Sequence, residues 1–134
     1  AVIAITPEGK IVLVKQYRKP LERTLVEIPA GKIEPDEAPE VTALRELEEE
    51  TGYTTKQLTY VTSFYTSPGF ADELIHLYYA ADLEVLPEKA TGDDDEFIEI
   101  MELTLEEAEQ YVKEKKIYDA KTAYAILYLR LMEK

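Results

Sequence analysis

Hydrophobic positions along the chain follow two periods, and this predicts a mixture of strands and helices. Two β-branched runs, at 1–5 and 11–17, are joined by a short segment that contains Pro7 and Gly9, and they predict a hairpin. Further strands are predicted at residues 25–28, 56–66, 73–83 and 97–103. The intervening stretch 87–95 is polar and predicts a loop.

Helical spacing of apolar residues predicts three helices, over 38–51, 104–116 and 119–132. The first has Pro39 in its first turn and Gly52 directly after its end, which are the positions that these residues favour. Thr104 and Glu107 form a capping-box pattern at the start of the second. Asp119 is the candidate N-cap of the third.

Strands and helices are mixed throughout a chain of 134 residues, which favours one α/β (α+β) domain spanning 1–134, with helices packed on a mixed β-sheet. No apolar run approaches the length of a membrane span, so no membrane partner is expected. The chain has no cysteine, which excludes thiolate chemistry and fits a cytoplasmic location.

The formal net charge of −13 changes the expected partners. A protein this acidic gains nothing from the charge of a nucleic-acid backbone, so no nucleic-acid partner is expected. A small phosphate compound is also repelled at long range, and it needs either bound cations or a local basic residue. Solubility is the simpler explanation of the acidity.

Acidic residues concentrate on the first predicted helix. Glu49 and Glu50 lie three and four positions beyond Glu46, so the three carboxylates share one face, where like charges repel one another. Arg45 can pair with Glu49 one turn further on. Clustered carboxylate oxygens suit a hard divalent cation such as magnesium. The alternative is a solvated acidic helix, whose apolar residues Val41, Leu44 and Leu47 dock on the sheet.

The spacing around these glutamates is more specific than their number. The order is Gly31, five residues, Glu37, seven residues, and then Arg-Glu-Leu-x-Glu-Glu-x-Gly-Tyr. This order resembles the Nudix box at every defined position, over residues 31–53. The resemblance implies a Nudix-type α/β/α sandwich with a mixed β-sheet, in which the glycine that matches Gly31 shapes the loop before the helix.

The resemblance also implies chemistry. The glutamates matching Glu46, Glu49 and Glu50, with the backbone carbonyl matching Ala30, hold Mg²⁺, with Mn²⁺ as an alternative, and the arginine matching Arg45 orients a glutamate. Water attacks a phosphorus atom of a nucleoside diphosphate compound. The metal neutralises charge on the phosphates and lowers the pKa of the water.

A narrower resemblance lies downstream, to the ADP-ribose pyrophosphatase branch. Pro68 lies sixteen residues beyond Gly52, within Ser67-Pro68-Gly69, and Glu73 follows four residues after Gly69. In that branch a proline stands at this position and a glutamate contacts the terminal ribose, so Pro68, Gly69 and Glu73 are candidate substrate-binding residues. The alternative for Ser67-Pro68-Gly69 is an ordinary turn.

Three further segments resemble the same branch, at 15–18, 27–31 and 116–122. They add Arg18 and Glu27 to the candidate substrate-binding residues. The arginine matching Arg18 contacts phosphate, often across a dimer, which implies a homodimer. Branch members usually carry an N-terminal β-subdomain that swaps between subunits, and the start at Ala1 indicates that such a segment is missing from this sequence.

The general base is expected outside the metal-binding glutamates, whose lone pairs the metal occupies. In the branch it is a glutamate from a loop before the final sheet strand, and Glu96 is the best match here. Asp94 and Asp95 are alternatives because loop alignments slip, and Glu49 is the next candidate. The run could also be a solvated turn only.

The sequence therefore predicts magnesium-dependent hydrolysis of ADP-ribose to AMP and ribose 5-phosphate. Hydrolysis of another nucleoside diphosphate sugar, an oxidised nucleotide or a dinucleoside polyphosphate remains open, as does a catalytically silent ligand sensor. His76 is the only histidine, and its place in an alternating strand favours a structural role. A Ser-His-Asp triad is left open, although no partner for His76 is evident.

Overall fold

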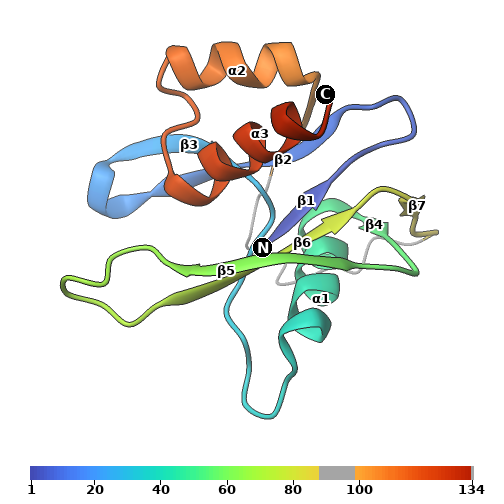
Figure 1. Ribbon diagram of the computed structural model, residues 1–134, viewed down its shortest axis with the longest axis horizontal. Helices are drawn as coiled ribbons and strands as arrows, with labels where there is room; N and C mark the ends of the chain where they lie inside the picture. The colour runs from blue at the N-terminus through green and yellow to red at the C-terminus, as the bar shows by residue number, and fades with distance from the viewer. Residues whose placement is uncertain (88–98, 134) are drawn as a thin grey trace.

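The elements of the protein were defined in a computed structural model that describes residues 1–87 and 99–133 (Figure 1). The strands are β1 (Val2–Ala4), β2 (Ile11–Arg18), β3 (Arg23–Glu27), β4 (Tyr53–Thr54), β5 (Thr59–Tyr65), β6 (Leu74–Ala80), β7 (Glu84–Val85) and β8 (Glu99–Leu103). The helices are α1 (Pro39–Thr51), α2 (Leu105–Lys113) and α3 (Ala120–Met132), with a 3-10 turn, η1 (Lys19–Leu21).

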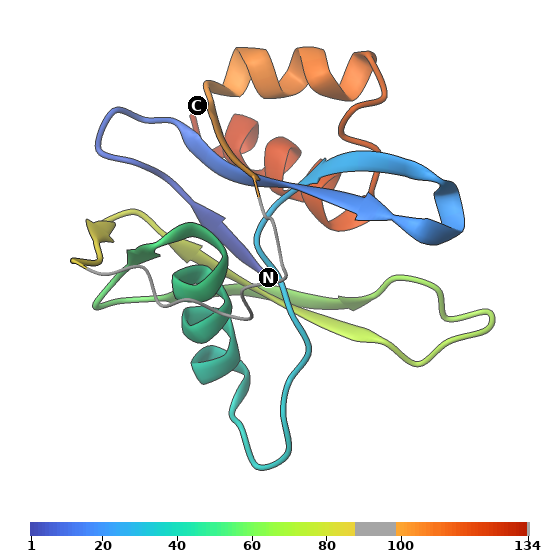
Figure 2. The ribbon, with the colours of Figure 1, turned by 180° about the vertical axis from the view of Figure 1, so that it is seen from behind.

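The strands pair into two larger sheets. One has the order β1-β6-β5, in which β1 is parallel and β5 antiparallel to β6, so this sheet is mixed. The other has the order β3-β2-β8 and is antiparallel. Helices α2 and α3 lie on one side of the strands and α1 on the other, as both views show (Figures 1 and 2). The predicted α+β sandwich with a mixed sheet is confirmed.

Two hydrophobic clusters correspond to these layers. Leu77 and its neighbours on one face of β6 pack with residues of α2 and α3, including Ala108 and Ile126. Tyr78, on the opposite face of β6, packs with Ala43 and Leu47 of α1. Side chains therefore alternate along β6 between the two layers, as expected of a strand that is covered on both faces.

The predicted hairpin over 1–17 is wrong, although its turn is correct. The turn closes through hydrogen bonds from Thr6 N to Lys10 O and from Gly9 N to Thr6 O, with Gly9 at a φ of 82°. Beyond one bridge between Ile5 and Ile11 the two strands separate into different sheets. The cause is the burial of β1 on both faces, which suits a strand paired in parallel with β6.

The helix predicted at 38–51 is present as α1, and Gly52 ends it in the left-handed conformation, with a φ of 75°. Its apolar face differs from the prediction, because Val41 is 53% exposed whereas Ala43 and Leu47 are buried. The buried face instead includes Thr42, Glu50 and Thr51. Polar side chains on an inward helix face are the first structural indication of a site.

The two C-terminal helices have the predicted caps. Thr104 and Glu107 form the complete capping box of α2, and the Asp119 side chain accepts a hydrogen bond from Thr122 N at the start of α3. Helix α2 ends at Lys113 instead of residue 116. Within the described residues, none of the helices combines the length and apolar character needed to cross a membrane.

Candidate active site

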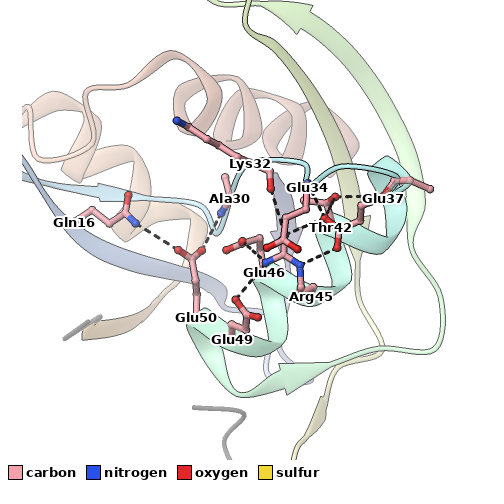
Figure 3. Close-up of polar contacts among 11 residues, drawn as sticks. Gln16, Ala30, Lys32, Glu34, Glu37, Thr42, Arg45, Glu46, Glu49 and Glu50 are labelled. Atoms are coloured by element: carbon pink, nitrogen blue, oxygen red, sulfur yellow. Dashed lines mark hydrogen bonds and ion pairs between the residues drawn. The ribbon is translucent and has the colours of Figure 1, made fainter. Parts of the chain in front are cut away.

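The loop between β3 and α1 faces the carboxylates of the acidic helix. Ala30 N donates a hydrogen bond to Glu50 Oε1 at 3.0 Å, and Gln16 Nε2 donates to Glu50 Oε2 at 3.4 Å (Figure 3). Only 5% of Glu50 is exposed. A buried carboxylate needs hydrogen bonds in place of water, and here the loop and β2 supply them.

Gly31 approaches Glu46 so closely that a larger residue would displace the Glu46 carboxylate. A Cβ atom added to Gly31 would lie 2.0 Å from Glu46 Cδ. Glu46 and Glu50 therefore face the same loop, as the spacing of four residues on one helix face requires. The box glycine is needed here because a side chain would displace the Glu46 carboxylate.

Arg45 holds the end of the loop against the helix. Its Nε and Nη2 atoms donate to the two oxygens of Glu37 at 2.8 and 3.0 Å (Figure 3). Nη2 also donates to the Lys32 carbonyl at 3.3 Å. The hydrogen bonds from Arg45, together with one from Thr42, lower the pKa of Glu37 to about 2, and the pKa of Arg45 is raised by the same pair. Both groups therefore stay charged at neutral pH.

The remaining guanidinium nitrogen of Arg45, Nη1, faces two carboxylates of the same helix. Arg45 Nη1 lies 2.8 Å from Glu46 Oε1 and 3.4 Å from Glu49 Oε2. The sequence predicted the Arg45–Glu49 pair, and it is present. It did not predict that Glu37 is the main partner of Arg45, although the fixed spacing of Glu37 within the box was a signal.

The carboxylates present are suitable ligands for a divalent cation, but they do not form a complete coordination site. Within residues 1–87 and 99–133, no three acidic, histidine or cysteine side chains already converge on one point suited to a metal ion. Glu46 and Glu50 nevertheless face one loop, and Arg45 meets Glu46 and Glu49 through Nη1 alone. A cation could bind these carboxylates in place of Nη1, while Nε and Nη2 of Arg45 remain hydrogen-bonded to Glu37. Oxygen ligands of this kind suit magnesium.

A cavity of about 610 Å³ adjoins this loop. Four of the predicted site residues line it: Arg18, Ala30, Glu46 and Glu73. The size is that of a site for a small organic ligand. In a protein with a net charge of −13, the cavity also has three basic lining residues, Arg18, Lys32 and Lys121, which is the local positive charge that a phosphate compound needs.

Glu27 lies behind the cavity wall rather than in it. Only 1% of Glu27 is exposed, and its oxygens accept hydrogen bonds from Arg18 at 2.8 and 2.7 Å and from Lys121 Nζ at 2.5 Å. Lys121 also donates to Asp119 at 3.0 Å. Burial opposes ionisation of Glu27, but Arg18 and Lys121 outweigh it and lower its pKa. Glu27 therefore positions two cations.

The remaining predicted residues lie apart from the cavity or outside the described chain. Pro68 and Gly69 belong to a turn in which Phe70 N and Ala71 N donate to Ser67 O at 3.1 and 2.9 Å, as in the simpler alternative. Neither is among the residues that line the cavity. Glu96 lies outside the residues that the structure describes.

The polar residues of the cavity wall that sequence reasoning missed include Gln16, Lys32 and Lys121. Each belongs to a segment that resembles the family, but the resemblance predicted no role for it. Gln16 and Lys121 come from β2 and α3, so only the tertiary arrangement brings them beside the loop of Lys32. A basic residue within a strongly acidic chain was the one available signal.

Comparisons with known proteins give matches over most of the chain. The family model described as the NUDIX domain matches residues 1–124. The chain is 66% identical over 133 residues to an "ADP-ribose pyrophosphatase" of Bacillus subtilis (strain 168), and 63% identical over 133 residues to a "Methanol dehydrogenase activator" of Bacillus methanolicus. Each alignment covers 99% of this chain and 72% of the relative.

A solved structure described as an ADP compounds hydrolase superposes with a TM-score of 0.84 at 22% identity. The superposition covers 98% of this chain and 70% of that one. At this identity the likeness concerns the fold alone.

Proposed function

The chain belongs to the Nudix family of hydrolases, and from that premise we propose that it hydrolyses ADP-ribose to AMP and ribose 5-phosphate. The observation that carries the proposal is the cavity, which brings Arg18, Glu46 and Glu73 together beside the acidic helix. The relative that is 66% identical, and named for this activity, supports the choice of substrate. Another nucleoside diphosphate sugar is the rival within the family.

Members of this family depend on divalent metal, and magnesium is the proposed ion, with manganese as an alternative. Glu46, Glu49 and Glu50 would hold it with the carbonyl of Ala30. When bound, the ion supplies positive charge at the pyrophosphate and a more acidic water. Arg45 keeps its hydrogen bonds to Glu37 and so fixes the loop that carries the carbonyl of Ala30.

Arg18 and Glu73 are the proposed substrate-binding residues. Arg18 offers the pyrophosphate a cation whose direction is set by its two hydrogen bonds to Glu27. Glu73 accepts a hydrogen bond from Thr66 Oγ1 at 3.3 Å and lines the cavity, where it can accept a further bond from a ribose hydroxyl. Pro68 and Gly69 would act indirectly, by shaping the turn that leads to Glu73.

A substrate panel tests this function. With magnesium present, ADP-ribose should give the highest kcat/KM among nucleoside diphosphate sugars and dinucleoside polyphosphates, with AMP and ribose 5-phosphate identified by chromatography. Glu73→Ala should raise KM more than it lowers kcat, because ribose binding is lost while the metal site remains. Glu84→Ala, an exposed acidic residue of β7, is the matched control. A preference of about tenfold for GDP-mannose would contradict the choice of substrate.

Glu96 is the proposed general base, with Asp94 and Asp95 as alternatives. A positioned base contributes typically ~100- to ~10,000-fold, so Glu96→Gln should lower kcat by that order and leave KM nearly unchanged. Asp93→Asn should have little effect. If neutralising each acidic residue from 93 to 96 leaves kcat within about threefold of the parent, the base lies elsewhere, and Glu49 is the next candidate.

A second candidate function is the activation of a dehydrogenase, since a relative 63% identical to this chain is named for it. The two functions can be separated with one variant. The rate of a methanol dehydrogenase is measured with the parent and with Glu50→Gln. Stimulation by the parent alone would link activation to hydrolysis, and stimulation by both would indicate binding alone.

We also propose a homodimer in the cytoplasm. The side chain of Arg18 is 44% exposed at the end of β2, so part of it remains accessible to a second subunit. Light scattering at high protein concentration tests the dimer, and a monomer there would contradict it.

A further inference from the structure

The only histidine of the chain lies on the cavity side of its strand. His76 lines the cavity, and it stands two residues before Tyr78 on β6. Residues two apart on a strand share a face, and Tyr78 packs toward Ala43 and Leu47 of α1. The His76 ring is therefore on the α1 side of the sheet, the side from which Pro39, Thr42 and Ala43 also reach the cavity.

One nitrogen of the ring is already engaged. Ser63 on β5 stands directly opposite His76 in the antiparallel ladder, and its Oγ lies 2.8 Å from His76 Nδ1. Nδ1 and Nε2 lie on different edges of an imidazole, so a ring held through Nδ1 still has Nε2 available. The partial burial of the ring and the contact with Ser63 fix its orientation.

A β-bulge extends this contact to a third residue. Tyr60 pairs with Tyr78, but the next pair is Thr62 with Leu77, so Val61 is an extra residue in β5. Residues three apart normally face opposite sides of a strand, and the extra residue puts Tyr60 and Ser63 on one side. The Tyr60 hydroxyl consequently lies 2.7 Å from Ser63 Oγ, and its ring packs edge-on against Tyr78 at 5.7 Å.

We propose that His76 is a substrate-binding residue, whose Nε2 atom donates a hydrogen bond to a phosphate oxygen of the nucleoside diphosphate sugar in the cavity. This inference rests on the proposed function, and it adds a contact that the box and the branch-like segments did not indicate. Ser63 and Tyr60 act through His76 and are positioning residues.

The direction of the hydrogen-bond chain follows from the ligand. A phosphate oxygen has lone pairs only, so Nε2 must carry the proton in a neutral ring. Nδ1 then accepts from the Ser63 hydroxyl, and Ser63 Oγ accepts from the Tyr60 hydroxyl. Each hydroxyl donates once, so the chain from Tyr60 to Ser63 to His76 can adopt this direction, which is the one that the substrate needs.

Two amide substitutions separate the edges of the ring. The amide of His76→Gln reaches the place of Nε2, and that of His76→Asn reaches only the place of Nδ1 beside Ser63. A hydrogen bond to a charged group is lost in His76→Asn, so KM for ADP-ribose should rise about tenfold with kcat within about threefold, and His76→Gln should keep KM within about threefold. Tyr60→Phe, which retains the ring that packs on Tyr78, should raise KM only about twofold.

A spectroscopic measurement on the unsubstituted protein does not depend on the folding of any variant. Because the chain has one histidine, its two ring nitrogens give one assignable set of ¹⁵N signals. With magnesium and saturating α,β-methylene ADP-ribose, which resists hydrolysis, Nε2 should carry the proton and its signal should shift.

The outcomes distinguish this inference from the function on which it rests. If the protein hydrolyses ADP-ribose but the analogue leaves both nitrogen signals unchanged, His76 does not bind substrate and the function stands. If His76→Asn keeps the parent KM and His76→Gln does not, the ring serves only to bond Ser63. If the protein neither hydrolyses ADP-ribose nor binds the analogue, the function and the inference both fail.

Discussion

One cluster of charge lies on α1 and the loop before it, another joins β2, β3 and the start of α3, and the two are balanced differently. Around Arg45, four carboxylates share one guanidinium: Glu34, Glu37, Glu46 and Glu49. Around Glu27, two carboxylates meet two cations, with Asp119 as the second carboxylate and Arg18 and Lys121 as the cations. The first cluster has an excess of negative charge, and the second has none.

The difference indicates what each cluster does. A set of equal and opposite charges needs no further cation, and the Glu27 cluster links side chains of β2, β3 and α3. An excess of carboxylates on one helix face repels itself, and a cation from outside the chain relieves that repulsion. We therefore expect Glu27 to stabilise the fold and to orient Arg18 toward the cavity, and we expect Glu46 and Glu49 of the Arg45 cluster, together with Glu50, to take the metal.

The largest expected effect is on turnover. Glu46→Gln and Glu50→Gln should each lower kcat by ~100- to 1,000-fold, because each removes a charged oxygen where charge neutralisation is the main task. Melting temperatures should stay near that of the parent. Chelation should abolish activity, and added magnesium should restore it. Initial rates at matched magnesium concentrations provide the measurement.

Glu48→Gln is the matched control for these variants. Glu48 belongs to the same helix, but its side chain accepts a hydrogen bond from Thr54 Oγ1 at 2.6 Å instead of facing the loop. The charge change is the same, so kcat should stay within about threefold of the parent. An equal loss of activity in Glu48→Gln would mean that only the net charge of the helix matters.

The next effect concerns stability rather than turnover. Glu27→Leu leaves Arg18 and Lys121 without their shared carboxylate, and removal of one partner from a buried pair costs about 3–5 kcal/mol. Glu109→Gln, in the more exposed pair of Glu109 with Arg130, should cost less than about 1 kcal/mol. Urea unfolding measures both. Similar losses of unfolding free energy in the two variants would contradict the special role of the Glu27 cluster in stability.

A smaller loss of rate should follow from a larger side chain at Gly31. Gly31→Ala places a methyl group where Glu46 Cδ lies 2.0 Å away, so the carboxylate must move. A displacement of about 1 Å costs up to about 100-fold in rate. In a Glu46→Gln background the same change should add little, because the two substitutions act on one ligand. Additive losses would show that Gly31 acts through something other than Glu46.

The pattern of the chain predicted most elements but not which strands pair. Periodicity identifies a strand at residues 11–17 correctly, yet it cannot show that β1 pairs with β6 instead of β2. The first residues of β1 and β6, Val2 and Leu74, are 72 positions apart in the sequence. That choice depends on burial of β1 from both sides. Val41 shows the same limit, since helical spacing alone does not reveal which of two adjacent apolar stripes meets the sheet.

For the site, the sequence was most informative where residues are close in the chain. Glu46 and Glu50 lie four residues apart on one helix, and their spacing correctly predicted that they face the same side. Glu27 was predicted to bind substrate, but its burial between Arg18 and Lys121 depends on α3, which is 94 residues away. Ser63 and His76 are likewise brought together only by the register of β5 and β6.

The central claim is that the excess of carboxylates on α1 binds a divalent cation. Calorimetric titration of metal-free protein with Mn²⁺ tests it most directly, without substrate or turnover. The parent should bind Mn²⁺, Glu50→Gln should bind it at least about tenfold more weakly, and Glu48→Gln should bind it as the parent does. Equal Mn²⁺ affinity in the parent and Glu50→Gln, with both proteins folded, would contradict the claim.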